Sequence, residues 1–120
     1  MQVSHNPFVT FSIATDNLEL IVGKAEKEVL CRSCADIIFF GTVLHDFENP
    51  KKALENAKEM LSPSGRLVNL DWKKKPMKLG PPLEKRFSQE KAGRLMVSAG
   101  FTILDIEDAG PYHYMVVARL

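Results

Sequence analysis

The stretch Ala35-Asp36-Ile37-Ile38-Phe39-Phe40-Gly41-Thr42-Val43-Leu44-His45-Asp46-Phe47 decides the fold of this chain. Its residues from Ile37 to Gly41 carry no polar side chain, whereas a strand with one solvated face would alternate between apolar and polar residues. The run therefore predicts a strand that is buried on both faces. Ligands of open α/β sheets bind beyond the carboxyl ends of such strands, so we expect functional residues first between Gly41 and Asp46.

A helix and a second strand are predicted directly after this run. Asn49 can cap the helix, and Pro50 suits its first position, where the backbone N–H has no partner to lose. The apolar residues that recur at the spacing of one helix face are Ala53, Leu54, Ala57, Met60 and Leu61. Residues 62–65, Ser-Pro-Ser-Gly, end the helix, and residues 66–71 follow as a strand. A strand–helix–strand connection of this length predicts a right-handed parallel crossover.

The C-terminal part predicts another helix and an antiparallel pair of strands. Ser88 caps a helix over Gln89–Ala99, and Gly100 follows as its terminating residue. The segments Phe101–Glu107 and Tyr112–Arg119 are predicted as strands. The four residues between them are too few for a crossover connection, so this pair must be antiparallel.

The segments outside these elements are the N-terminal part and one central loop. Phe8–Ala14 suits a strand by its β-branched and aromatic residues, and equally suits a helix that starts at Pro7. Leu18–Gly23 is predicted as a strand, and Lys24–Leu30 as a short charged helix or a loop. The basic, proline-rich segment Trp72–Pro82 is predicted as a long loop, of a length that often serves as a lid.

Together these elements predict an α/β fold with a three-layer, mostly parallel sheet and an antiparallel last strand. The 120 residues are expected to form one domain, 1–120, in which residues 1–17 remain unassigned. Sixteen basic and fifteen acidic residues give a formal net charge of +1, which supplies no field to attract nucleic acid or a membrane surface. No signal peptide and no stretch of about 20 apolar residues occurs, so we expect a cytoplasmic protein.

Two cysteines raise the question of a metal or redox site. Cys31 and Cys34 have the spacing of half a zinc site or of a redox pair. A second ligand pair is missing, and the motif precedes a strand, whereas redox pairs open a helix. We therefore expect reduced, inert thiols and no metal site, with a metal completed by His5 or His113 as the alternative.

Five segments, in order, resemble the class I S-adenosylmethionine-dependent methyltransferases that act on small molecules. Residues 22–26, Val-Gly-Lys-Ala-Glu, stand where that family has a Gly-Asp-Ala stretch that contacts adenine. Residues 35–47 resemble its fourth strand with a Val-Leu-His turn, and residues 53–67 resemble its Leu-x-Pro-Gly-Gly-Arg-Leu signature after a helix. Asp71 matches the acidic end of its fifth strand, and residues 99–101 match its Ala-Gly-Phe before the sixth.

The resemblance implies a Rossmann-like fold and methyl transfer from S-adenosylmethionine to a small-molecule substrate. It implies a cofactor site formed by Gly23, Lys24, Ala25, Glu26, Gly41 and Thr42. It places His45 and Asp46, as the catalytic candidates, where the turn after the fourth strand faces cofactor and substrate. A histidine there can act as a general base, because its ordinary pKa lies near neutrality. The alternative is that His45 caps the turn and only hydrogen-bonds backbone.

The first part of the family's domain has no counterpart in this sequence. Its glycine-rich cofactor loop and the acidic residue after its second strand are both missing, and only seventeen residues precede Leu18. Two βα units of roughly 30 residues each would be needed to supply them. A second hypothesis is therefore a non-catalytic remnant that serves as a homodimeric interaction module. Loss of the first strand would expose the backbone edge at Ile37–Phe40, which a second copy of the chain could cover.

Overall fold

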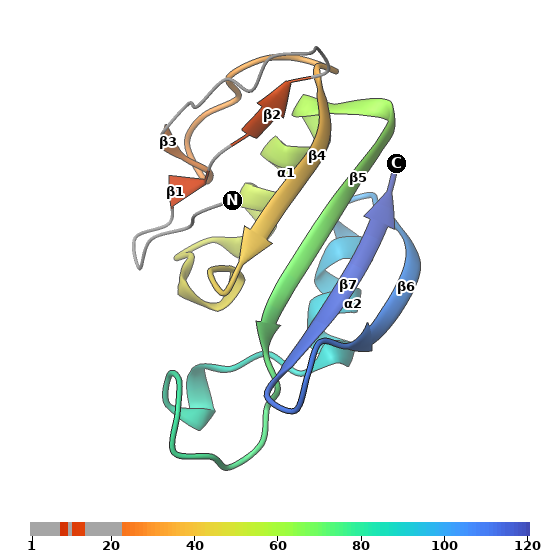
Figure 1. Cartoon of the computed structure of the whole chain (residues 1–120). Coiled ribbons are helices and arrows are strands. Elements are labelled where there is room, and N and C mark those ends of the chain that lie inside the picture. The colour runs from red at the N-terminus through yellow and green to blue at the C-terminus, as the bar shows by residue number, and fades with distance from the viewer. Residues whose placement is uncertain (1–7, 10, 14–22) are drawn as a thin grey trace.

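A computed structural model describes residues 8–9, 11–13 and 23–120 of the chain (Figure 1). Its main sheet has five strands in the order β2-β4-β5-β7-β6, and β1 and β3 pair separately as a small two-stranded sheet. The strands of the main sheet are β2 (Phe11–Ile13), β4 (Ala35–Gly41), β5 (Leu61–Trp72), β6 (Thr102–Asp108) and β7 (His113–Arg119). The predicted α/β class, Rossmann-like arrangement and antiparallel last strand are confirmed, whereas the described main sheet is mixed and not mostly parallel, since only β4 and β5 pair in parallel.

The predicted parallel crossover is formed by β4, helix α1 (Pro50–Met60) and β5. The Asn49 side chain caps the helix, since its Oδ1 accepts a hydrogen bond of 3.1 Å from the Lys52 N–H. β4 and β5 then pair in parallel, with Ile38 opposite Leu67. The carboxyl ends of both strands consequently lie at the same edge of the sheet.

The second helix, α2 (Gln89–Ser98), is followed by the predicted antiparallel pair β6 and β7. Ser88 caps it, as its Oγ accepts a hydrogen bond of 3.2 Å from the Lys91 N–H. Gly100 has φ +102°, a left-handed conformation that only glycine adopts readily, and it turns the chain from α2 into β6. β7 enters the sheet between β5 and β6 and is antiparallel to both.

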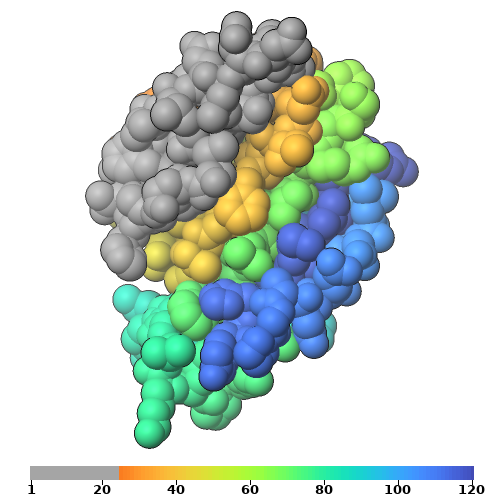
Figure 2. All heavy atoms as spheres, viewed as in Figure 1, coloured from red at the N-terminus to blue at the C-terminus, as the bar shows by residue number. Residues whose placement is uncertain are grey.

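Both described helices cover the same face of the sheet, and the opposite face is the one seen in Figure 2. The helix-covered face holds the core, with fully buried Ile38, Phe40, Leu67 and Val116. On the other face Ile37 is 52% exposed. The prediction that this strand is buried on both faces is therefore wrong for β4. The residues on its outer face are also apolar, so the sequence shows no alternation between polar and apolar residues. No described helix lies over this outer face.

The N-terminal segments form strands, which resolves the choice left open for Phe8–Ala14. β1 (Phe8–Val9) pairs antiparallel with β3 (Gly23–Lys24), and β2 pairs antiparallel with β4, placing Phe11 opposite Ile38. The chain thus covers part of the β4 edge itself. Most of the predicted strand Leu18–Gly23 lies outside the described residues. After β3, which includes Lys24, the chain forms a turn at residues 25–27 and irregular backbone at 28–30, so the loop alternative for Lys24–Leu30 is correct.

Candidate functional site

A buried histidine–carboxylate pair lies at the edge where β4 and β5 end. His45 belongs to a short 3-10 helix, η1 (Leu44–Asp46), directly after β4, and Asp71 is the penultimate residue of β5. The Nδ1 atom of His45 is 2.9 Å from Oδ1 and 3.0 Å from Oδ2 of Asp71. The two side chains are only 3% and 1% exposed. The His45 side chain therefore binds a carboxylate.

The hydrogen bonds around Asp71 determine which ring nitrogen of His45 carries the proton. Asp71 Oδ1 also accepts a bond of 2.8 Å from the Trp72 N–H, so this carboxylate acts as an acceptor. Nδ1 of His45 must then donate, which leaves the lone pair of a neutral ring on Nε2. The nearest carboxylate to Nε2 is that of Asp46, whose Oδ1 lies 3.5 Å away and whose side chain is 34% exposed.

The pKa of His45 is raised above its ordinary value. Burial lowers this pKa, but the hydrogen bond and negative charge of Asp71, together with the charge of Asp46, raise it by more. The cation of Arg86 opposes that rise. Burial and the charges of Asp71 and Glu90 also raise the pKa of Tyr114, the residue opposite Asp71 on β7. Its phenol stays protonated and donates a hydrogen bond of 3.0 Å to the Phe87 carbonyl oxygen.

The raised pKa of His45 predicts that the protein loses stability as the pH rises above neutral. Native His45 holds its proton more tightly than a histidine of the unfolded chain, so the native state binds more protons and ΔG of unfolding falls with pH. The stabilisation is complete below the ordinary value of 6.5 and is lost as the pH passes the native pKa. Urea unfolding from about pH 6 to about pH 9 should show a slope of at most about 1.4 kcal/mol per pH unit.

The variant His45→Gln should remove this slope, whereas His113→Gln, which alters a half-buried histidine of β7, should keep it. A slope that survives in His45→Gln would mean that another group causes it.

A single buried arginine holds the loop Trp72–Pro82 over this edge. Arg86 is 3% exposed, and its guanidinium donates to four backbone carbonyl oxygens. Nε donates to Pro81 at 2.8 Å, Nη1 to Lys73 and Lys75 at 3.2 Å each, and Nη2 to Leu79 at 2.5 Å. The same guanidinium lies 5.6 Å from the Trp72 ring centroid. The predicted loop is thus an ordered cover.

His45 and this loop line an open cavity of about 460 Å³, a size suited to small-molecule ligands. The residues that line it are Thr42, His45, Asp46, Trp72, Gly80 and Pro81. Thr42 has φ +58°, an unusual value for a residue with a side chain, and its N–H donates to the Leu70 carbonyl at 2.7 Å. This strained turn directs the chain from β4 into η1 and so places His45 at the cavity.

The predicted cofactor residues do not all meet at this cavity. Thr42 lines it together with the catalytic candidates His45 and Asp46, whereas Gly41 lies just before it at the end of β4. In the other predicted group, Gly23–Glu26, the Ala25 carbonyl accepts a bond of 2.9 Å from the Asn56 side chain. The Glu26 carboxylate accepts one of 2.6 Å from the Asn49 N–H. This group therefore braces the start of α1.

Three important residues of the site were not predicted as such from the sequence. Asp71 was noted only as the acidic end of a strand, although the rule that parallel strands end at one edge pointed to its meeting His45. No pattern in the sequence predicts that Arg86 is buried or that Trp72 lines the cavity.

The cysteines differ from the sequence expectation. Cys31 and Cys34 are joined in a disulfide, so the prediction of reduced thiols is wrong. Within the described part of the chain, no three histidine, cysteine or acidic residues gather in a way that would hold a metal ion. None of the described helices is both long and apolar enough to cross a membrane.

The sequence of residues 5–69 matches the model of a methyltransferase domain family, and this match covers more than half of the chain. The chain belongs to the class I S-adenosylmethionine-dependent methyltransferases. Among solved methyltransferases, an S-adenosylmethionine-dependent enzyme from Aquifex aeolicus superposes with a TM-score of 0.78 at 30% identity. The superposition covers 86% of this chain and 55% of that enzyme.

Two further methyltransferases extend the comparison. A protein from Sulfolobus solfataricus described as a type 11 methyltransferase has a TM-score of 0.68 at 26% identity, over 78% of this chain and 54% of its own. Human N-acetylserotonin methyltransferase, solved with S-adenosylmethionine, shares the fold with a TM-score of 0.64 at 21% identity, over 81% of this chain and 32% of its own. No curated protein matches the chain. The chain thus spans about half the length of the first two methyltransferases.

Proposed function

We propose that this chain transfers a methyl group from S-adenosylmethionine to a small-molecule acceptor in the cytoplasm, with His45 as the general base. The observation that carries the proposal is the buried His45–Asp71 pair, because His45 also lines a cavity of about 460 Å³, a size suited to a small-molecule ligand. A histidine oriented by a carboxylate is the arrangement that removes a proton from an attacking nucleophile.

Each residue of the pair has a defined task in this proposal. Asp71 holds the ring through Nδ1–H and keeps the lone pair on Nε2. Nε2 would take the proton of the acceptor's hydroxyl or amine as that atom bonds to the methyl carbon, while the bond from this carbon to the sulfonium sulfur breaks and S-adenosylhomocysteine leaves. The resulting imidazolium is stabilised by Asp71 on one side and by Asp46, 3.5 Å from Nε2, on the other. The cover held by Arg86 excludes water from the reacting atoms.

S-adenosylmethionine supplies an electrophilic methyl group on a positively charged sulfonium. The cavity suits such a cation, because the carboxylate of Asp46 is partly exposed at its wall. The strand end at Gly41 and Thr42 would contact the same ligand. Gly23–Glu26 would serve the adenine side, with two of its acceptors already engaged by α1. The described residues provide no glycine-rich loop for the methionine end.

Calorimetry with S-adenosylmethionine and S-adenosylhomocysteine tests this proposal. We expect heat of binding with both ligands at micromolar to submillimolar concentration. His45→Gln should bind the cofactor as the wild type does, because His45 acts on the acceptor. Absence of binding heat for both ligands would refute the proposal.

The second candidate function is a non-catalytic, homodimeric interaction module. It is favoured by the sheet face that no described helix covers, where Ile37 is 52% exposed and Phe39 and Val68 are half-buried. Light scattering at low micromolar concentration, read together with the calorimetry, distinguishes this module from the methyltransferase. A particle of twice 13.5 kDa without cofactor binding supports the module, and a monomer of 13.5 kDa opposes it.

A further inference from the structure

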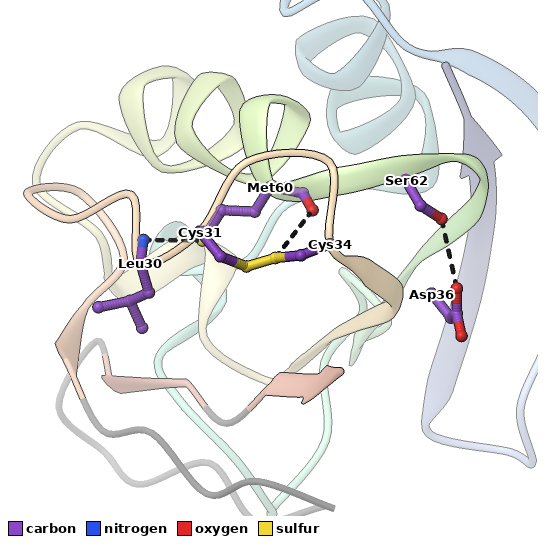
Figure 3. The surroundings of a disulfide bond; sticks show 6 residues. All are labelled: Leu30, Cys31, Cys34, Asp36, Met60 and Ser62. Carbon is purple, nitrogen blue, oxygen red and sulfur yellow. Dashed lines mark hydrogen bonds between the residues drawn. A yellow bond between two sulfur atoms is a disulfide. The ribbon is translucent and has the colours of Figure 1, made fainter. Parts of the chain in front are cut away.

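The disulfide between Cys31 and Cys34 lies far from the cavity of the proposed site, in the loop that precedes β4. Figure 3 shows it against the C-terminal end of α1, where the Leu30 N–H and the Cys34 sulfur both face Met60. Both cysteines are half-buried, while Arg32 and Ser33 between them are exposed. A reagent in solution can therefore reach this bond, unlike a disulfide enclosed in a core.

The loop around the disulfide is held in place by contacts that do not involve sulfur. The N–H groups of Ser33 and Cys34 donate to the Glu59 and Met60 carbonyls, each at 2.9 Å. These are the free carbonyls at the end of α1, so the loop serves as the cap of that helix. An ion pair of 3.0 Å between Arg32 and Glu59 adds to the attachment.

The segments on both sides of the loop are anchored independently as well. Before the loop, the Ala25 carbonyl is bonded to the Asn56 side chain. After it, the Ser62 hydroxyl donates to the Asp36 carboxylate at 3.4 Å, as Figure 3 shows. Because only two residues separate the cysteines, the disulfide restricts little of the unfolded chain, and its contribution to stability is small.

The loop has a strained backbone conformation at Ser33, and it places a hydrogen-bond acceptor beside the sulfur of Cys34. Ser33 has φ +52°, a left-handed conformation that a residue with a side chain adopts at a cost. Disulfides closed across strained backbone are the more readily reduced ones. Cys34 Sγ lies 3.8 Å from the Met60 carbonyl oxygen, within reach of a thiol S–H. A reduced Cys34 would thus find a hydrogen-bond acceptor without moving.

We propose that Cys31 and Cys34 form a redox-active pair, which exchanges between disulfide and dithiol with small-molecule thiols while the fold stays intact. A thiolate of the small molecule attacks one sulfur, the Cys31–Cys34 bond breaks, and the released cysteine thiolate takes up a proton. A second small-molecule thiolate attacks the mixed disulfide, frees the other cysteine and leaves as part of the oxidised small molecule. The protein disulfide gains two electrons and two protons, and two thiols are joined as one disulfide. The proposal does not depend on methyl transfer.

Glutathione buffers of varied ratio test this proposal on the full chain. After equilibration without air, the protein is quenched with acid, labelled with a maleimide and weighed by mass spectrometry. We expect no label in excess oxidised glutathione, two labels in excess reduced glutathione, and return to no label when the buffer is reversed. Circular dichroism of the reduced protein should be unchanged, and its Tm should fall by only a few degrees.

Single-cysteine variants are the matched controls. Cys31→Ser and Cys34→Ser should each carry one bound glutathione in the oxidised buffer, because no neighbouring thiol resolves the mixed disulfide. The double variant should fold as the wild type does. The proposal is overturned if wild-type label appears only after denaturant is added, if reduction or the double variant unfolds the chain, or if the reduced pair binds stoichiometric zinc.

Discussion

Replacing Asp71 by Asn should lower the rate of methyl transfer by about 10²-fold or more, with a much smaller effect on cofactor binding. An amide can turn its N–H₂ group toward Nδ1 of His45 and so favour the ring form that carries the proton on Nε2. That form has no lone pair at the cavity and cannot accept a proton. The substitution also removes the main cause of the raised pKa of His45. The acid limb of the pH–rate profile should therefore move to lower pH.

Asp46→Asn is the matched control, because it removes the same charge from the other side of the ring. Asp46 contacts Nε2 only at 3.5 Å and is partly exposed, so its loss should lower the rate far less than loss of Asp71. NMR titration of His45 in each variant gives a readout that does not require an identified acceptor. Equal effects of the two substitutions on rate and titration would contradict the role assigned to Asp71.

Replacing Arg86 by Met should destabilise the protein by about 2–4 kcal/mol and release the cover of the site. Methionine fills similar space but offers no donor to the carbonyls of Lys73, Lys75, Leu79 and Pro81. The Tm should fall by roughly 10 °C. Because the loop contains exposed lysines, limited trypsin digestion should cut it much faster than in the wild type.

Two further substitutions show whether the geometry of the guanidinium matters. Arg86→Lys keeps the charge but presents one compact donor group, so it should rescue little of the stability. Lys85→Met, at an exposed neighbouring position, should change neither the Tm nor the digestion rate. Full rescue by lysine would mean that charge alone holds the loop.

The sequence predicted best those parts of the fold that depend on local chemistry. The cap at Asn49 and the apolar spacing of the helix that follows it are local patterns, so α1 and the crossover to β5 were predicted correctly. The exposure of Ile37 was not predicted, because it depends on whether another element covers that face of the sheet. An apolar residue gives the same sequence pattern whether the face is covered or exposed.

The site was predicted in part for a similar reason. His45 lies at a strand end, a position that sequence can identify, but its partner Asp71 comes from a strand 26 residues further along the chain. The cover depends on Arg86, whose burial and bonds to backbone carbonyls are determined by the tertiary structure and cannot be recognised in the sequence. The pairing of Cys31 and Cys34 could not be predicted from spacing alone, because the spacing allows a disulfide, a metal site or free thiols.

The position of β7 between β5 and β6 has a consequence for how the chain acquires its structure during synthesis. When β6 leaves the ribosome, the strand that joins it to β5 has not yet emerged. β5 and β6 then each keep an unpaired edge, a state in which nascent chains associate wrongly. The short β6–β7 turn lets a hairpin form within microseconds once β7 emerges, and this hairpin must then dock on β5 as a unit. Docking of this hairpin on β5 is therefore a late event in the formation of the sheet.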